Sequence, residues 1–477
     1  MQRPLAHRRL ERKRFLLSYE DRFRKRADGR SWPRWRNTVK AAHHYHEGLL
    51  TSGARKNMQN LAKREDVPED QLEQFIRESP WDYQGLQDEL VTNVPGTIRS
   101  TKAGLLIDDF GIAKQGSKSV GVQRQYSGTL GKEGNCQVAV NLVLVAPGEQ
   151  RNSDQKTWPL GTQLYLPESW VKDKARREEA RVPAGVQFRT KPQIALDMLT
   201  RVRTQGVEHA FIGGDAGYGA GGDFRAQLRA WKEPYVLGVN PEGLSVVPAT
   251  VPLVPPAGRR KHPTYPEGTR VELAKDVFQR ASWEWVEWGV GSRTRSKNPR
   301  GKRPASEETV PLGSFFYREQ VRVVKADGEA TDEVAWLLLE KRKDEKGRDE
   351  FKAYICWGMG EASLRLLAER AHLRWAIEQF HKEGKQLLGL DRFEGRTWQG
   401  WHHHVSMVLL AYAFLSRLRA GHDDNGPLPS LRSVAMAVEW EIATQTLMED
   451  HALERGRAKA YAGSVLRKVS DWFKPRK

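Results

Sequence analysis

Two apolar runs of this 477-residue chain lead directly into aspartates, and this feature restricts the fold more than any other. The run "GLLIDDF" (residues 104–110) leads into Asp108 and Asp109, and "AFIGGDAGYG" (residues 210–219) leads into Asp215. Burying an ionised carboxylate is costly unless it is paired or binds a metal. In open α/β sheets, ligands bind beyond the carboxyl ends of the strands. We therefore expect two strands that present these carboxylates side by side.

The elements around the two runs alternate in type. Residues 103–146 carry strand patterns, and predicted helices at 191–205 and 222–231 each lead into a further strand. A strand–helix–strand order predicts parallel strands in an α/β layer. Residues 150–190 read as a polar loop that contains a basic helix. The chain is therefore predicted to be an α/β protein.

The composition indicates a folded protein in a reducing compartment. Apolar residues make up 39% of the chain, which includes 16 Trp, and this argues against disorder. Two cysteines, Cys136 and Cys356, are too few for a disulfide framework or a structural zinc site. The longest apolar run, residues 405–415, is too short to cross a bilayer and is predicted to be a buried helix. We expect no membrane segment and a cytoplasmic location.

The first 40 residues form a basic arm. They contain 14 Lys and Arg against 4 Asp and Glu, in a chain whose net charge is +18. Each Lys or Arg on a phosphate releases condensed counterions, so such an arm is typical of a segment that binds nucleic acid. Trp32 and Trp35 are suited to stacking on bases or sugars, and with them we single out Arg24, Lys25 and Arg26 as DNA contacts. The alternatives are a solvated basic tail and a contact with an anionic membrane.

A later helix carries a third candidate acid. In "HLRWAIEQFHKEGKQLLGLD" (residues 372–391), a polar stripe at helical spacing contains Arg374, Glu378, His381 and Lys385. Taken alone, Arg374 and Glu378 are equally well explained as a surface ion pair between residues four apart. Taken with the two strand acids, Glu378 becomes the third carboxylate of one site.

The three acids together predict a divalent metal site. Carboxylates that lie close together repel one another unless a cation separates them. Their oxygens are hard ligands, which select Mg²⁺ or Mn²⁺. The alternative for Asp215 is structural, because an Asp at the start of "DAGYG" can cap that turn. The combination of two strand acids with a helix acid favours the metal site.

These features resemble those of the DDE transposases of bacterial insertion sequences, in the group with a Y–R–E–K signature. The signature is Tyr, two residues, Arg, three residues, Glu, six residues and Lys. Arg374, Glu378 and Lys385 fit this spacing, whereas Ala371 stands at the Tyr position. The segments "IDDFGIAKQG", "LYLPESWVKD", "FIGGDAGYG" and "GLDRFEGRTWQGWHHH" also resemble the family and follow its order. The resemblance covers roughly residues 40–418.

The resemblance implies a ribonuclease-H-like core with Asp108, Asp215 and Glu378 as catalytic acids. In the family, the first Asp follows an apolar strand and is separated by one residue from a Thr or Ser. In this chain Asp109 is that spacer and Phe110 stands at the Thr position. Asp109 therefore stays an alternative to Asp108 as the first acid.

The implied activity is cleavage and strand transfer of double-stranded DNA at the ends of an insertion sequence. Two Mg²⁺ or Mn²⁺ ions held by the three acids would clamp the attacking and leaving oxygens of an in-line displacement. Arg374 and Lys385 would lie against phosphates. A homodimer is expected on the paired inverted ends and the target DNA, in the bacterial nucleoid, because each chain offers one such site. Its contacts are expected in the helical segments 38–92 and 420–477.

A strand-rich insertion explains the long gap between Asp215 and Glu378. Relatives with the signature carry such an insertion, and some stack an aromatic side chain on a flipped base of a DNA hairpin. Trp283 and Trp285 share a face of a strand-like run, which makes them candidates for base stacking; packing inside the insertion is the alternative. The expected divisions are a basic arm and helical DNA-binding domain (1–98), the first part of the core (99–240), the insertion (241–355), the second part of the core (356–420) and a C-terminal helical region (421–477).

Two other functions are compatible with these features. One is a transposase-derived DNA-binding protein without catalysis, which the departures at Ala371 and Phe110 favour. The other is a metal-dependent nuclease used for something other than transposition.

Two runs of histidine are the remaining candidate metal ligands. They lie at residues 43–46 and 402–404, without a nearby Cys or a carboxylate at ligand spacing. We therefore expect them near DNA or on helix surfaces, and not around a metal.

Overall fold

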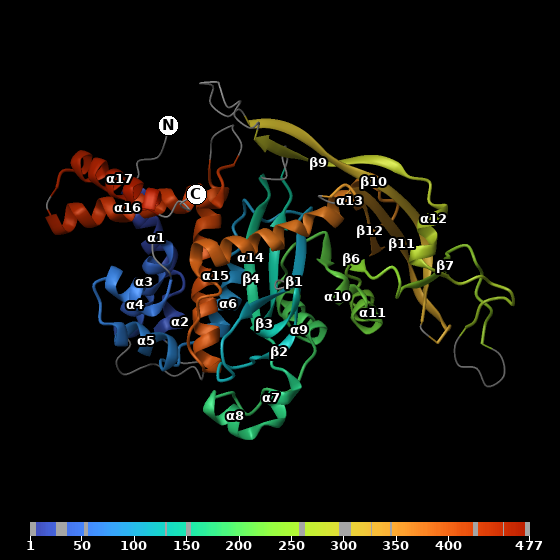
Figure 1. Cartoon of the computed structure of the whole chain (residues 1–477), viewed down its shortest axis with the longest axis horizontal. Helices are drawn as coiled ribbons and strands as arrows, with labels where there is room; N and C mark the ends of the chain where they lie inside the picture. The colour runs from blue at the N-terminus through green and yellow to red at the C-terminus, as the bar shows by residue number, and fades with distance from the viewer. Residues whose placement is uncertain are drawn as a thin grey trace.

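The computed structural model of the chain shows a mixed α/β protein with one large mixed sheet and helices at both ends of the chain (Figure 1). It describes residues 6–24, 36–51, 56–128, 131–148, 154–256, 263–294, 307–325, 327–343, 346–422, 428–451 and 453–472. Within these ranges, no helix has the length and apolar character needed to cross a bilayer. The prediction of an α/β fold is confirmed.

The core of the sheet has five neighbouring strands in the order β4–β3–β1–β5–β6. Their bounds are β1 (Gly104–Ala113), β3 (Lys132–Ala146), β4 (Lys156–Leu164), β5 (Phe211–Gly214) and β6 (Tyr235–Val239). β3 runs antiparallel to β1 and β4, whereas β1, β5 and β6 are parallel to one another. A short strand, β2 (Gln123–Ser127), pairs with the first part of β3.

The prediction of a polar loop at residues 150–190 is wrong where β4 forms. Trp158 and Leu160 of β4 are buried, and the strand pairs with β3. Pro159 disguises the strand in the sequence, because proline cannot donate a ladder hydrogen bond and is rare in sheet interiors. It is accommodated beside an irregularity in the β3–β4 register, where regular pairing is interrupted.

Helices cover both faces of the core sheet. α9 (Lys191–Thr204) packs on β3 and β4 from one face, and α14 (Trp375–Leu388) packs on β1 and β4 from the other. α13 (Leu364–Leu373) precedes α14, and α15 (Trp398–Ala420) follows it. α15 is buried along nearly its whole length, so the prediction of a buried helix at residues 405–415 is confirmed.

The terminal helices are α1 (Ala6–Leu17), α2 (Glu20–Arg24), α3 (Arg36–Leu50), α4 (Met58–Arg64), α5 (Glu69–Arg77), α6 (Tyr83–Thr92), α16 (Leu431–His451) and α17 (Arg455–Trp472). Four of the terminal helices, α3, α5, α6 and α16, pack on α15, and the others pack on these or on one another (Figure 1). The basic arm contributes to this packing, because Phe15, Leu16, Tyr19 and Phe23 are buried. In its described part, residues 6–24 and 36–40, the arm is therefore not a solvated tail.

The prediction that the second histidine run lies near DNA or on a helix surface is wrong. His402, His403 and His404 are buried in α15, where packing on all sides excludes water. Backbone carbonyls contact two of the rings: His403 Nδ1 lies 2.9 Å from the Ile76 carbonyl, and His404 Nε2 lies 3.0 Å from the Gly389 carbonyl. The triplet is therefore part of the core.

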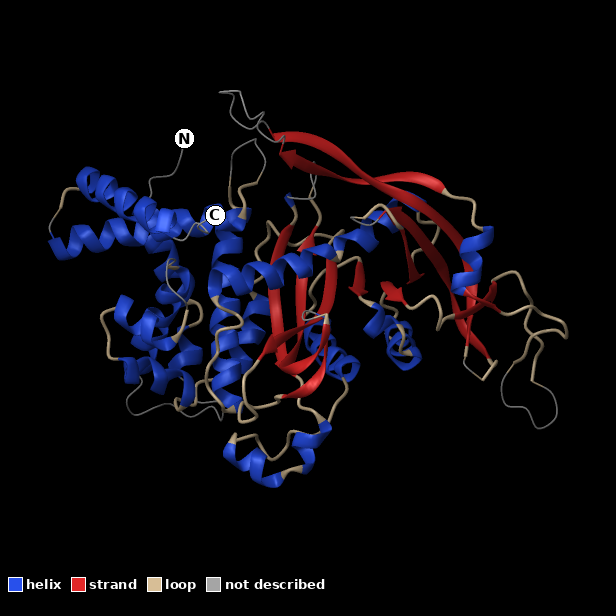
Figure 2. Ribbon diagram, in the orientation of Figure 1, coloured by secondary structure: helices blue, strands red, loops and turns tan. Residues whose placement is uncertain are grey.

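The insertion continues the core sheet. Its elements are β7 (Ser245–Pro248), β8 (Glu272–Leu273), α12 (Ala274–Arg280), β9 (Glu284–Thr294), β10 (Glu307–Val324), β11 (Ala330–Lys343) and β12 (Asp349–Trp357). β12 pairs antiparallel with β6, and β11, β10, β7 and β8 follow in order (Figure 2). The expected division between residues 355 and 356 falls inside β12.

Candidate active site

Strands β1 and β5 bring Asp108 and Asp215 next to each other. In their parallel register, Leu106 lies opposite Gly213. Asp108 lies two residues further along β1, and Asp215 lies directly after the end of β5, so the two acids are close enough for Asp215 to repel the Asp108 carboxylate. β1 continues to Ala113 along β3, so Asp108 is not at the strand end but where β1 leaves β5.

Asp215 also has the structural role considered above. It is the N-cap of the short helix α10 (Ala216–Gly219), where its Oδ1 accepts a hydrogen bond of 2.9 Å from the Gly217 amide. Capping occupies one carboxylate oxygen through this bond. The cap therefore orients the side chain and is compatible with a second role for the other oxygen.

Asp109 lies on the opposite face of β1 from Asp108, as strand alternation requires. Its Oδ2 forms an ion pair of 3.0 Å with Lys191 at the start of α9. Burial raises the pKa of Asp109, and the Lys191 ammonium opposes that rise. No local pattern in the sequence identifies Lys191, because its partner lies 82 residues away.

Arg374 connects the strand acid with the helix acid. Its guanidinium contacts Asp108 Oδ2 at 3.3 Å and Glu378 Oε1 at 2.5 Å. The expected ion pair between residues four apart is present, but it is one half of this bridge. Arg374 also separates α13 from α14, so the single helix expected around the stripe is two helices.

The two strand acids lie close together, and Asp108 is buried. Burial, followed by repulsion from Asp215, raises the pKa of Asp108 to about 8, although Arg374 opposes the rise. A divalent cation bound between Asp108 and Asp215 would remove the repulsion that raises this pKa, so the pair of carboxylates is suited to binding one. In the described ranges, no group of three or more His, Cys, Asp or Glu side chains is arranged to hold a metal ion. The expected cluster with Glu378 is therefore not closed in this conformation, in which the Arg374 guanidinium bridges Asp108 and Glu378.

Lys385 lies two turns along α14 from Glu378 and is half-buried. Its Nζ donates to the Gly111 carbonyl at 3.3 Å and lies 5.4 Å from the centre of the Phe110 ring. Burial lowers the pKa of Lys385. Its described contacts are with the end of β1, beside the acids.

Trp375 is a residue of this region that the sequence analysis did not single out. It follows Arg374 directly, begins α14 and is 51% exposed. Ile377 and Phe380 of the same helix are buried, so Trp375 lies off the apolar face. An aromatic residue outside the apolar face of an amphipathic helix was the signal in the sequence.

The candidate DNA contacts of the arm are only partly described. Arg24 forms ion pairs with Glu20 at 2.5 Å and with Asp21 at 3.6 Å. Lys25, Arg26, Trp32 and Trp35 lie outside the described residues. The structure thus places Arg24 among acids of its own helix.

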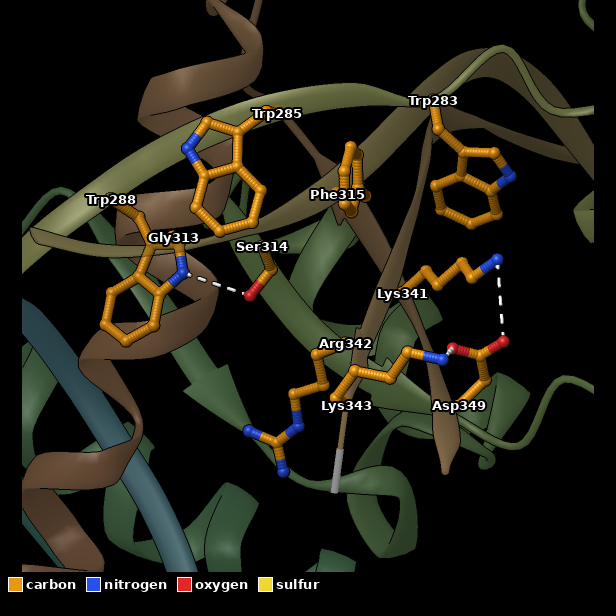
Figure 3. Close-up of a pocket in the computed structure, with 10 residues that line it drawn as sticks. All are labelled: Trp283, Trp285, Trp288, Gly313, Ser314, Phe315, Lys341, Arg342, Lys343 and Asp349. Atoms are coloured by element: carbon orange, nitrogen blue, oxygen red, sulfur yellow. Dashed lines mark hydrogen bonds and ion pairs between the residues drawn. The ribbon is translucent and has the colours of Figure 1, made fainter. Parts of the chain in front are cut away.

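The insertion carries an aromatic pocket of about 600 Å³ (Figure 3). Trp285 is 52% exposed and meets Phe315 edge-on at 5.2 Å between ring centres. Trp283 also lines the pocket but stacks on Phe278. Lys341 and Lys343 line the same pocket and pair with Asp349. The pocket therefore combines an exposed aromatic side chain with basic groups.

Comparisons with known proteins agree on one kind of enzyme. A family model described as "DDE superfamily endonuclease" matches residues 26–295, and one described as "Transposase DDE domain" matches residues 189–414. The "Probable transposase for insertion sequence element IS701" of Microchaete diplosiphon is 30% identical over 205 residues, which are 43% of this chain and 49% of that protein. The match thus spans about half the length of this curated relative.

Among solved structures, the chain is similar to a piggyBac transposase in a synaptic complex with hairpin DNA. The sequence identity is 10% and the TM-score is 0.38, over 92% of this chain and 77% of the other.

Proposed function

This chain belongs to the DDE superfamily of endonucleases, and on that premise we propose that it cuts DNA at the ends of an insertion sequence and joins those ends to target DNA. The observation that carries the proposal is the placement of Asp108 near Asp215, with Arg374 linking Asp108 to Glu378 of α14. Double-stranded DNA is the substrate in this proposal.

We also propose that the core is ribonuclease-H-like. The supporting observation is the strand order β4–β3–β1–β5–β6, with three antiparallel strands followed by two that are parallel to β1. Helices on both faces complete such a core. We propose the same five divisions of the chain as expected from sequence, except that the insertion ends after β12 and not at residue 355.

Asp108, Asp215 and Glu378 would hold two Mg²⁺ or Mn²⁺ ions. When bound, these ions supply charge neutralisation and Lewis acidity at the phosphoryl group. Asp108 must release its proton to serve as a ligand, since its pKa is raised to about 8 by burial and by Asp215. Asp109 is the weaker candidate for the first acid, because it faces Lys191 on the other side of the sheet.

Arg374 and Lys385 are proposed to bind DNA phosphates near the acids. The Arg374 guanidinium contacts both Asp108 and Glu378, and a phosphate would attract the same fork of donors. Moving Arg374 onto a phosphate would free the two carboxylates. Lys385 donates to the Gly111 carbonyl at 3.3 Å, and a phosphate oxygen would replace this neutral acceptor with a charged one.

The deciding experiment uses DNA that flanks the coding sequence in its genome. Purified protein is incubated with labelled end DNA and a target plasmid, with Mg²⁺, with Mn²⁺ or with chelator. Metal-dependent nicking followed by joined products supports a transposase. Nicking without joined products points to a nuclease, and binding without nicking points to a DNA-binding protein that lacks catalysis.

The basic arm offers a test of DNA binding. Truncating it would remove the buried Phe15 and Tyr19, so charge substitution is the sharper change. The double variant Lys25→Gln/Arg26→Gln is expected to reduce the slope of log K against log salt by about 2, since each phosphate contact contributes about 0.9. The control is Lys172→Gln/Lys174→Gln, which removes the same charge from two exposed positions outside the arm. Equal slopes for both variants and wild type would show that the arm does not contact phosphates.

The aromatic pocket offers a test of base stacking, which we propose for Trp285 with Trp283 beside it. Replacing Trp285 with Ala is expected to weaken binding of hairpin-tipped DNA about 10-fold, because stacking one base contributes about 1–3 kcal/mol. Binding of fully paired DNA should change little. Tyr126→Ala removes an exposed aromatic residue from β2 and serves as the control. A loss that is equal for both DNAs would assign Trp285 to packing.

We propose that the chain acts as a homodimer on two DNA ends. α16 and α17 pack on each other, and they expose Met436, Trp440 and Tyr461. These apolar side chains support the C-terminal helices as a contact between copies. Adding Glu378→Gln chains in excess should lower cleavage by wild-type chains, and the complex with end DNA should have the mass of two chains. Undiminished activity on mixing, together with a one-chain complex, would contradict the dimer.

A further inference from the structure

A row of polar side chains crosses the core sheet beneath α14. Asp108 lies opposite Asn141 in the β1–β3 register, and Asn141 lies opposite Thr162 in the β3–β4 register. Residues that face each other on neighbouring strands project to the same side of the sheet. Asp215 directly follows β5, the strand on the other side of β1, and lies near Asp108. The row therefore begins with two acids and continues into buried, uncharged side chains.

His381 of α14 joins this row from above. Its Nε2 lies 2.7 Å from Asn141 Nδ2, and both side chains are buried. The Thr162 hydroxyl donates to Asn141 Oδ1, so the Asn141 amide group is left to donate to His381. His381 Nε2 is therefore the acceptor, and its ring is neutral. Burial and the nearby charges of Lys385 and Arg374 lower the pKa of His381 to about 3, which agrees with this assignment.

The far end of the row is fixed by two further helices. Gln87 of α6 accepts from the Thr162 amide at 3.1 Å and donates to Ser406 of α15 at 3.0 Å. Gln87 and Ser406 are also buried. Thr162 and Asn141 thus present a defined donor to α14, because their other hydrogen-bonding groups already have partners.

From this geometry we propose that Asn141 and His381 are positioning residues, which fix α14 on the sheet so that Glu378 faces Asp108 and Asp215. Asn141 is the cross-strand neighbour of Asp108, and His381 follows Glu378 by three residues, or about 4.5 Å along the helix axis. The hydrogen bond between Asn141 and His381 thus links the strand beside Asp108 to the helical turn that carries Glu378. Apolar contacts of Ile377 and Phe380 hold the helix on the sheet but are not directional, whereas this bond specifies one position.

The catalytic consequence rests on the proposed function, whereas the positional consequence does not. The experiment therefore combines amide hydrogen exchange of α14 in metal-free protein with DNA cleavage at increasing Mn²⁺. His381→Leu removes the acceptor, and His381→Gln retains one at a similar position. His403→Leu is the matched control, since it also removes a buried, hydrogen-bonded histidine but lies on α15.

His381→Leu is expected to accelerate exchange about 10-fold in residues 375–382 and to raise the half-saturating Mn²⁺ concentration about 10-fold. DNA affinity should stay unchanged, and His381→Gln should restore most of both effects. His403→Leu should lower the unfolding temperature without either effect. If His381→Leu does not fold, Asn141→Ser is measured in the same way.

Unchanged exchange in α14, or equal effects of His381→Leu and His403→Leu, would overturn the positioning role. Exchange in α14 that is as fast in His381→Gln as in His381→Leu would also overturn it. If wild-type protein does not cleave DNA under any metal condition, the proposed function fails, and the exchange comparison still decides whether the pair positions α14.

Discussion

Replacing Asp108 with Asn is expected to lower metal-dependent DNA cleavage about 10³-fold, and Asp215→Asn and Glu378→Gln should do the same. Losing a carboxylate that holds a catalytic ion removes several kcal/mol of transition-state stabilisation, and about 4 kcal/mol corresponds to this factor. The measurement is single-turnover cleavage of end DNA at saturating protein.

The thermal stability of these variants distinguishes lost chemistry from lost folding. Above about pH 8, where Asp108 is charged, Asp108→Asn should raise the unfolding temperature of metal-free protein, because burial and repulsion by Asp215 outweigh the ion pair with Arg374. Asp109→Asn is the matched control on the adjacent residue: it breaks the ion pair with Lys191 and leaves the proposed ligands in place. Greater loss of cleavage in Asp109→Asn than in Asp108→Asn would make Asp109 the first acid.

Acidification is expected to unfold the protein steeply between about pH 6.5 and pH 4. Burial lowers the pKa of His402 to about 4, of His403 to about 3 and of His404 to about 4. Unfolded histidines titrate near 6.5, so in this window the unfolded chain binds more protons than the folded chain. Their contribution to stability is therefore complete above about pH 6.5 and is lost as the pH falls. Three such groups remove about 4 kcal/mol per pH unit, which is a large part of the stability of a typical domain.

Urea unfolding at half-unit steps of pH measures this slope. His403→Gln should reduce the slope by about 1.4 kcal/mol per pH unit, because one buried histidine no longer titrates. The same substitution at an exposed position, His422→Gln, is the matched control. A slope that is unaffected by His403→Gln would mean that other groups govern acid unfolding.

The strand acids could be predicted from sequence because each is preceded by a run of buried residues. Leu105, Leu106 and Ile107 lead into Asp108, and Phe211 and Ile212 lead into Asp215. Such runs report local structure directly. The hydrogen bond between Asn141 and His381 joins residues 240 apart, so no local pattern contains it.

Other parts of the fold were concealed by composition. The charges of α1 and α2 outweigh Phe15, Tyr19 and Phe23, which recur at helical spacing and are buried. Pro159 conceals β4. The sequence predicted the acids that directly follow an apolar run. It did not predict features that depend on pairing between residues far apart in the chain.

The pairing of β12 with β6 limits how this protein can exchange parts with its relatives. Residues 353–357 of β12 fill the hydrogen-bonding edge of β6, and β6 in turn borders β5, which leads into Asp215. A hybrid protein that joins the insertion of one relative to the core of another must therefore keep β12 and β6 able to pair. A crossover in the loop after Trp357 takes both strands from the same relative, whereas a crossover between residues 355 and 356 takes part of β12 from a different one. Recombination that produces working hybrids should accordingly leave β12 and β6 with the same ancestry.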